Sequence, residues 1–317
     1  MTPRTGTRPM PDLSASFPGP FPVSPHAADT AGQLERWLAA YPLVASERAR
    51  AALCDITGHG VARTFPAADP AGLELCADLL LWLTAFDDAY GEQTGAADPG
   101  ALVARVAGAV HVLNGRRPPG GGDVFCAALA DALARLGERA APERFLRVAA
   151  AVRDSLYGLV WEAHALAAGG RVGVPEYRAM RPHTVFVATV TALAEPVLGY
   201  ELAPAARASS PVRELESAVA DLAGWINDLA SYDRERARAG GAEPFGLPTL
   251  LAAAEGYGID KAFAAVCALC EEEAGKARAR IVELTAAGGP VAAHARALEG
   301  VAASYVWHIG HRRYDGG

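Results

Sequence analysis

Two groups of oxygen-bearing side chains, far apart along the chain, have the types and spacing that a metal ion requires. The first is the run DDAYGE, which places Asp87, Asp88 and Glu92 at the end of an apolar stretch. If that stretch is a helix, the dipole at its C-terminal end disfavours carboxylates there. Such acids also occur where a helix simply ends in water, but a bound cation would offset the repulsion. The pattern therefore predicts a cation beside this helix end.

The second group lies in the run NDLASYDRE. Asn227, Ser231 and Glu235 are spaced at i, i+4 and i+8, so their side chains share one face of a helix. An amide carbonyl, a hydroxyl and a carboxylate form an all-oxygen set, which suits Mg²⁺ that shares the oxygens of a phosphate. Arg234 adds a positive charge that a metal alone does not need.

Alone, the second motif could be an ordinary solvated helix face. Together, the two groups indicate metal ions held between two helices, with a phosphate-bearing ligand completing the coordination. The chain has no GxxxxGK[ST] loop in a βαβ context, so a diphosphate fits better than a triphosphate.

Helices must position both groups, because alternating β-branched runs that would predict strands are nearly absent. Breaks fall at runs rich in Gly and Pro, such as NGRRPPGGGD. The expected helices cover residues 32–41, 45–57, 70–89, 100–112, 123–138, 142–169, 176–198, 211–236, 247–255, 259–286 and 289–312. The sequence predicts a flexible Pro-rich leader over residues 1–20 and one all-α domain over residues 21–317, larger than a four-helix bundle.

Composition narrows the class of protein. Hydrophobic residues make up 51% of the chain, which can build a large helical core, and a net charge of −7 argues against a nucleic-acid partner. No apolar run reaches the ~18 residues that span a bilayer. The Pro-rich N-terminus has no apolar segment typical of a secretion signal, so we expect a cytoplasmic protein.

Cysteines and histidines are not expected to hold a metal. Cys267 and Cys270 form a CxxC inside a helical pattern, which favours small core residues over a zinc or redox site. Four histidines are interpreted as partly exposed helix residues: His164, His183, His308 and His311.

Taken together, the motifs resemble those of bacterial class I terpene synthases, also called terpene cyclases. DDAYGE matches the DDxxxE form of the aspartate-rich motif of that family, and NDLASYDRE matches its NDxxSxx(R/K)E motif. The run EYRAMRPHT places Arg181 where the family has an arginine that senses the diphosphate. The run HRRYDGG supplies Arg313 and Tyr314, similar to the pair that closes over the diphosphate. The Pro-rich opening is similar as well, so the resemblance extends over most of the chain.

The resemblance implies a single α-domain in which a helical barrel surrounds a deep apolar cavity, with the two metal motifs on facing helices. It implies three Mg²⁺ ions. The implied metal ligands are Asp87, Asp88 and Glu92 on one side, with Asp87 bridging two ions, and Asn227, Ser231 and Glu235 on the other. The implied diphosphate ligands are Arg181, Arg234, Arg313 and Tyr314. Glu162 stands where the family often keeps an acid near the metals, although an ordinary surface glutamate is an equal interpretation.

The chain departs from the family pattern just after Arg181. The family usually has a linker residue and a small effector, often Gly, at a helix break, whereas this chain has Thr184 and Val185. Val185 still offers a backbone carbonyl, and Pro182 can interrupt the helix by removing one hydrogen bond. Residues 233–248 are interpreted as a lid, or alternatively as a plain surface connection.

A carbocation in the cavity would need aromatic faces, each worth ~1–2 kcal/mol when desolvated. The candidates are Phe65, Phe86, Tyr157, Trp161, Phe186 and Trp307, and Trp307 matches a common family position. Leu83 and Thr84 lie one helical turn before Asp87, where relatives often carry Phe. Smaller side chains there would enlarge the pocket and favour a C20 over a C15 substrate. No general base is evident for the last proton.

The function that the resemblance implies is Mg²⁺-dependent ionisation and cyclisation of a linear prenyl diphosphate, either farnesyl (C15) or geranylgeranyl (C20) diphosphate, with release of diphosphate. One alternative is a chain-elongating prenyl diphosphate synthase, but that activity needs two DDxxD motifs. The other is a non-catalytic isoprenoid-binding protein, which would not need the metal ligands. Such helical domains can form homodimers, and no residue of the sequence indicates an interface.

Overall fold

The computed structural model describes residues 8, 10–117 and 122–309, without the side chains of residues 92 and 93, and every regular element among them is an α-helix. The helices are α1 (Ala27–Ala40), α2 (Glu47–Thr64), α3 (Pro70–Tyr90), α4 (Glu92–Ala97), α5 (Pro99–Leu113), α6 (Val124–Arg139), α7 (Pro142–Ala167), α8 (Val174–Thr184), α9 (Val187–Leu198), α10 (Pro204–Arg207), α11 (Ser210–Arg238), α12 (Leu247–Glu255), α13 (Ile259–Ala286) and α14 (Gly289–His308). The predicted all-α class is confirmed. Only the short helices α4 and α10 were not expected.

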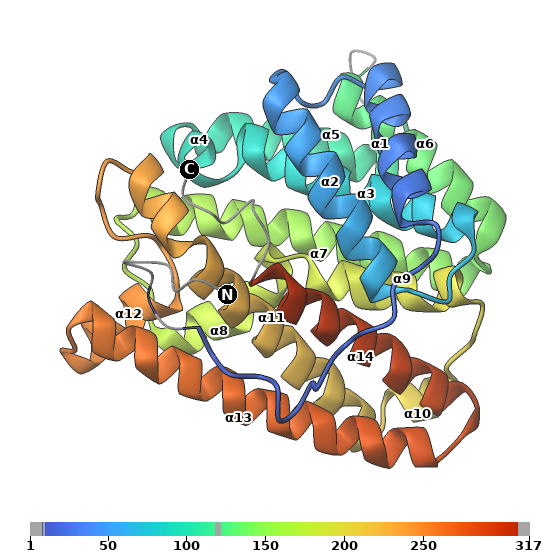
Figure 1. Cartoon of the computed structure of the whole chain (residues 1–317). Helices are drawn as coiled ribbons and strands as arrows, with labels where there is room; N and C mark the ends of the chain where they lie inside the picture. The colour runs from blue at the N-terminus through green and yellow to red at the C-terminus, as the bar shows by residue number, and fades with distance from the viewer. Residues whose placement is uncertain (1–7, 9, 118–121, 310–317) are drawn as a thin grey trace.

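The long helices pack as a barrel around one cavity (Figure 1). α11 packs against α8, α9, α13 and α14, and α7 packs against α4, α5, α8 and α9. α3 packs against α1, α2, α6 and α9. Side chains from α2, α3, α7, α8, α9, α11, α12 and α14 line the cavity between them, so the predicted barrel is confirmed. No helix in the described part of the chain is long and apolar enough to cross a bilayer.

α3 carries the first acidic group, and the residues at its N-terminus are typical of a helix start. The Asp69 side chain accepts a hydrogen bond from the backbone N–H of Gly72 at 2.7 Å, and Pro70 occupies the first turn. Most of the helix is buried, and Trp82 is 0% exposed with its indole N–H donating to the carbonyl of Phe125 at 2.8 Å. Burial on nearly all sides explains why this stretch is mostly apolar, with Glu74 and Asp78 as exceptions before its last turn.

The predicted helix 176–198 is interrupted at the place where the sequence indicated a break. α8 ends at Thr184 and α9 begins at Val187. Between them, Phe186 adopts a left-handed conformation with φ of 62°, which is uncommon and costly for a residue with a side chain. Tyr305 of α14 donates its hydroxyl to the carbonyl of Val185 at 3.2 Å, so a contact from another helix supports the break.

The N-terminal segment differs from its prediction. Leu13 is 4% exposed and Phe17 is 2% exposed, and both belong to the main core. The backbone N–H of Asp12 donates to Glu271 of α13, and the segment crosses in front of α13 and α14 (Figure 1). The prediction of a flexible leader is therefore wrong for residues 10–20, because two apolar side chains pack into the barrel. Residues 1–7 and 9 lie outside the described residues.

We expect Phe17→Ala to lower the free energy of unfolding by roughly 3 kcal/mol or more, because it empties a buried site. Leu146→Ala is the matched control, since Leu146 is 65% exposed and its truncation is expected to cost less than about 0.5 kcal/mol. Urea unfolding followed by circular dichroism measures both. Equal stability of the two variants would show that the N-terminal segment does not pack against the barrel in solution.

Cys267 and Cys270 lie on α13 as buried thiols. Burial raises the pKa of the Cys267 thiol to about 11. The thiols are therefore protonated core groups, as the sequence predicted.

Candidate active site

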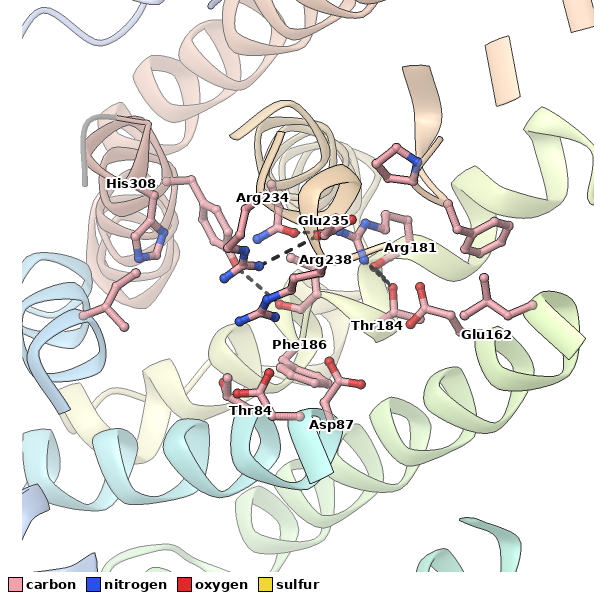
Figure 2. A pocket seen from close by; sticks show the side chains of 18 of the residues that line it. Thr84, Asp87, Glu162, Arg181, Thr184, Phe186, Arg234, Glu235, Arg238 and His308 are labelled. Atoms are coloured by element: carbon pink, nitrogen blue, oxygen red, sulfur yellow. Dashed lines mark hydrogen bonds and ion pairs between the residues drawn. The ribbon is translucent and has the colours of Figure 1, made fainter. Parts of the chain in front are cut away.

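One cavity of about 500 Å³ opens between the two acidic helix ends. Asp87 and Asp88 line it from the end of α3, and Asn227 and Glu235 line it from α11. Figure 2 shows Thr84 and Asp87 on one wall, with Arg234 and Glu235 facing them across the space. The structure thus brings the two predicted groups, from distant parts of the sequence, to opposite sides of the same chamber.

The end of α3 is shaped by a glycine. Gly91 follows the helix, and its N–H donates to the carbonyl of Asp87 at 2.7 Å. A Cβ added at Gly91 would lie 2.0 Å from Oδ1 of Asp87, so only glycine leaves room for that carboxylate. Glu92 begins α4 immediately afterwards, but its side chain lies outside the described atoms.

α11 runs without interruption through the second motif, so the expected one-face register is present. Asn227 and Glu235 line the cavity. Ser231, between them, is 1% exposed, and its hydroxyl is buried with no hydrogen-bond partner among the described residues. Buried hydroxyls are nearly always hydrogen-bonded. The hydroxyl oxygen of Ser231 is therefore suited to coordinate a cation.

The donor set around the cavity suits a hard cation. The described residues hold no group of three or more His, Cys, Asp or Glu that could bind a metal. The α11 set instead uses an amide, a hydroxyl and one carboxylate, and an all-oxygen set of this kind suits Mg²⁺ when a ligand supplies further oxygens. The residues present therefore fit a magnesium ion shared with a phosphate group.

Arg181 lies at the centre of the polar contacts. Its guanidinium donates to Oδ1 of Asn227 at 2.7 Å and to the hydroxyl of Thr184 at 2.8 Å, and it pairs with Oδ1 of Asp228 at 2.7 Å. Burial lowers the pKa of Arg181, but the carboxylates of Asp228, Glu162 and Glu235 together outweigh it, so the pKa is well above its ordinary value. The guanidinium is therefore charged, as anion binding requires.

Glu162 lines the cavity from α7 and is 8% exposed. The alternative that it is an ordinary surface glutamate is therefore wrong. Its carboxylate raises the pKa of Arg181, so it belongs to the same charged site.

Two further arginines line the cavity. Arg234 lies 3.8 Å from the carboxylate of Glu235. Arg238 was missed in the sequence, although its i+4 spacing from Arg234 places both on one helix face; its side chain lines the same cavity (Figure 2). Arg313 and Tyr314, the other predicted diphosphate ligands, lie outside the described residues.

Several predictions of which residues form the apolar wall of the cavity need correction. Leu80 and Thr84 of α3 line the cavity, together with Thr184, Val185 and Phe186 at the helix break. Leu83 and Phe86 do not: both are almost fully buried on other faces of α3. The ring of Phe86 stacks on Trp82 with centroids 5.1 Å apart, so Phe86 is a core residue rather than a cavity residue.

Aromatic candidates elsewhere are also corrected. Tyr157 is 64% exposed, and Phe65 is buried away from the cavity. Trp307 does not line the cavity; its ring packs under Arg63 at 4.3 Å from the guanidinium carbon. Its neighbour His308 lines the cavity instead (Figure 2). The sequence could not separate these two, because adjacent residues on a helix point in directions ~100° apart.

The connection between α11 and α12, residues 239–246, contributes Ala239, Ala242, Glu243, Pro244 and Phe245 to the cavity lining. It covers part of the chamber and is therefore more than a plain surface connection.

Comparison with known proteins agrees with this geometry. The family model "Terpene synthase family 2, C-terminal metal binding" matches residues 78–276. A (12E)-labda-8(17),12,14-triene synthase from Streptomyces anulatus is 59% identical over 96% of this chain and 95% of the relative. A synthase of the same name from Streptomyces cyslabdanicus is 55% identical over 97% of this chain and 94% of the relative. A farnesyl diphosphate-cyclizing (−)-alpha-amorphene synthase from Streptomyces viridochromogenes is 32% identical over 75% of this chain and 70% of the relative.

Solved structures share the fold. The linalool/nerolidol synthase from Streptomyces clavuligerus has a TM-score of 0.76 at 24% identity, covering 92% of this chain and 98% of that one. A protein obtained by ancestral sequence reconstruction, SVS_A2, has a TM-score of 0.82 at 21% identity and covers 96% of this chain and 89% of that one. The metal-binding family model, the identity to named synthases and the two facing motifs agree, and the chain belongs to the class I terpene synthases, the metal-dependent lyases that convert a prenyl diphosphate into a terpene.

Proposed function

We propose that this synthase forms a labdatriene from a C20 allylic diphosphate in which the two labdane rings are already closed. The relatives at 59% and 55% identity are labda-8(17),12,14-triene synthases, and a third, at 37% identity over 87% of this chain, is a labda-7,13(16),14-triene synthase. The C20 substrate agrees with the small Thr84 side chain on the cavity wall.

The proposal that the two rings are already closed in the substrate rests on where the acidic residues lie around the cavity. Closing the labdane rings from a linear chain requires a proton on the terminal alkene, at the opposite end from the diphosphate, and hence an acid there. The acidic residues of the described lining all come from α3, α7, α11 and the connection after α11: Asp87, Asp88, Glu162, Glu235 and Glu243. The α2 wall contributes Ile56, Thr57, Gly60, Val61 and Thr64, and none of them carries a carboxylic acid.

In this proposal the oxygen ligands hold three Mg²⁺ ions between α3 and α11. The ligands are Asp87, Asp88 and Glu92 on the α3 side, and Asn227, Ser231 and Glu235 on α11. The ions, when bound, supply positive charge that stabilises the diphosphate as it leaves. Arg181 and Arg234 donate hydrogen bonds to the same oxygens in a partly buried site, where such charge is more effective than in water. Arg313 and Tyr314 are proposed to complete this set.

The apolar residues of the cavity lining contact the hydrocarbon part of the substrate. Loss of diphosphate leaves an allylic cation spread over C13 to C15 of the labdane side chain. Loss of one proton from C12 then forms the C12–C13 double bond of the 12,14-diene. The products are the triene, diphosphate and a proton. Leu80, Val190 and the ring of Phe186 present apolar surface to this cation, exclude water and offer one aromatic face.

The test is incubation of the purified protein with Mg²⁺ and three substrates: a bicyclic labdadienyl diphosphate, geranylgeranyl diphosphate and farnesyl diphosphate. Gas chromatography–mass spectrometry is expected to show a labdatriene from the bicyclic substrate alone. A chelator should abolish product, and excess Mg²⁺ should restore it. Cyclic products from a linear substrate at comparable rates would refute the preformed bicycle. Longer diphosphates would indicate chain elongation, and no turnover of any substrate would favour a binding protein.

A further inference from the structure

Asp228 follows Asn227 in the second motif but points to the other side of α11, into the protein. It is 5% exposed and does not line the cavity. Three donors from other elements meet its carboxylate. The hydroxyl of Tyr177 lies 3.0 and 2.9 Å from its two oxygens, Arg181 pairs with Oδ1 at 2.7 Å, and the backbone N–H of Leu247 donates to Oδ2 at 2.9 Å. A buried carboxylate needs such partners, and these three leave it well satisfied.

The contact with Arg181 fixes the direction of a residue of the diphosphate site. The same guanidinium nitrogen, Nη2, contacts Asn227 on the cavity side and Asp228 on the buried side. α11 also leaves space for the stem of this arginine, because a Cβ added at Gly224 would lie 2.7 Å from Cγ of Arg181. The arginine is thus held flat against α11 between a neutral amide and a buried anion.

The contact with Leu247 fixes a second part of the cavity. Leu247 is the first residue of α12, at the end of the connection 239–246 that lines the cavity. A carboxylate that accepts from a free N–H at a helix N-terminus is favoured by both the hydrogen bond and the helix dipole. Asp228 therefore joins α8, α11 and the end of this connection at one buried point.

We propose that Asp228 is a positioning residue for diphosphate binding, which holds Arg181 and the cavity-lining connection 239–246 in a single arrangement. The inference deepens the proposed diphosphate site and is independent of which prenyl chain the diphosphate carries.

The same pair of helices supplies a matched control. Arg178 of α8 and Asp221 of α11 form another ion pair, at 3.6 Å, and neither residue lines the cavity. If Asp228 acted only by holding α8 on α11, loss of the Asp221 pair would have a similar effect. If Asp228 positions the diphosphate site, only its own loss affects binding.

The experiment is isothermal titration of the full chain with inorganic diphosphate in excess Mg²⁺. We expect Asp228→Asn to weaken diphosphate binding roughly 10- to 100-fold, since it removes a charge-assisted contact that orients Arg181. Asp221→Asn should stay within about twofold of wild type. Limited proteolysis should cut the connection 239–246 faster in Asp228→Asn alone. Binding by Asp228→Asn within twofold of wild type, or equal weakening in both variants, would overturn the proposal.

If circular dichroism shows that Asp228→Asn does not fold, two milder variants test the positioning role of Asp228. Tyr177→Phe removes one donor to Asp228, and Gly224→Ala displaces Arg181 directly. Weakened diphosphate binding in both supports the proposal, and wild-type binding in both refutes it. If the wild-type chain itself fails to bind diphosphate with Mg²⁺, the diphosphate site is wrong; if only the variants behave as wild type, the role of Asp228 is wrong.

Discussion

Glu235→Gln is expected to reduce product formation at least roughly 10²- to 10³-fold while the protein keeps its helical content and thermal stability. The carboxylate is a proposed metal ligand on the cavity wall, and an amide of the same shape carries no charge for the cation. The stability of the fold should change little, because Glu235 is partly exposed and its ion pair with Arg234 is long, at 3.8 Å. Such exposed pairs contribute little to stability.

The matched control is Glu214→Gln, on the same helix α11 but outside the cavity. Steady-state rates with the preferred diphosphate, together with thermal melts, test both variants. Asn227→Ala should behave as Glu235→Gln does, since it removes the first oxygen of the same set. Wild-type turnover in either cavity variant would show that α11 does not hold a metal.

Arg181→Ala is expected to have two separate effects. It removes a proposed donor to the diphosphate, so kcat/KM should fall roughly 10²-fold or more. It also leaves the carboxylate of Asp228 buried without its counter-ion, which should cost about 3–5 kcal/mol of stability. Arg181→Lys should not restore full activity, because an ammonium lacks the planar fork that matches diphosphate oxygens.

A double variant separates the two effects. Arg181→Ala with Asp228→Asn removes both charges, so the free energy of unfolding should recover in part while activity stays lost. Arg178→Ala is the control for loss of an arginine on α8, since Arg178 pairs with Asp221 outside the cavity. Urea unfolding and steady-state kinetics measure the outcomes. Full activity of Arg181→Ala would exclude this residue from the diphosphate site, and an unchanged stability would exclude the buried pair.

Much of the site could be predicted because its signals are local. The spacing of Asn227, Ser231 and Glu235 is a property of one continuous helix, and α11 reproduces it. The break after Thr184 was likewise indicated by a residue close in sequence, Pro182, although Pro182 itself lies inside α8. Most helix ends lie close to Gly or Pro residues, where the chain either leaves the helical conformation or loses a hydrogen bond. For such features, neighbours in sequence carry the information.

The orientation of apolar helices could not be predicted in this way. α3 is buried on nearly all sides, so its sequence has no polar face that would show which residues meet the cavity. Leu83, Thr84 and Phe86 were expected there; Thr84 does line the cavity, together with Leu80, whereas Leu83 and Phe86 do not. Likewise, nothing local in the N-terminal segment indicates that Leu13 and Phe17 pack into the barrel.

The sequence by itself determined the all-α class, the family and the candidate oxygen ligands on each of two helices, because each rests on residue types at short, fixed spacings. Only the tertiary structure decided that the two ligand groups face one chamber, that its α2 wall carries no acid, and that Asp228 joins Arg181 to the start of α12. Those contacts link residues from separate helices, and their geometry depends on how each helix is rotated in the barrel, which local spacing does not specify.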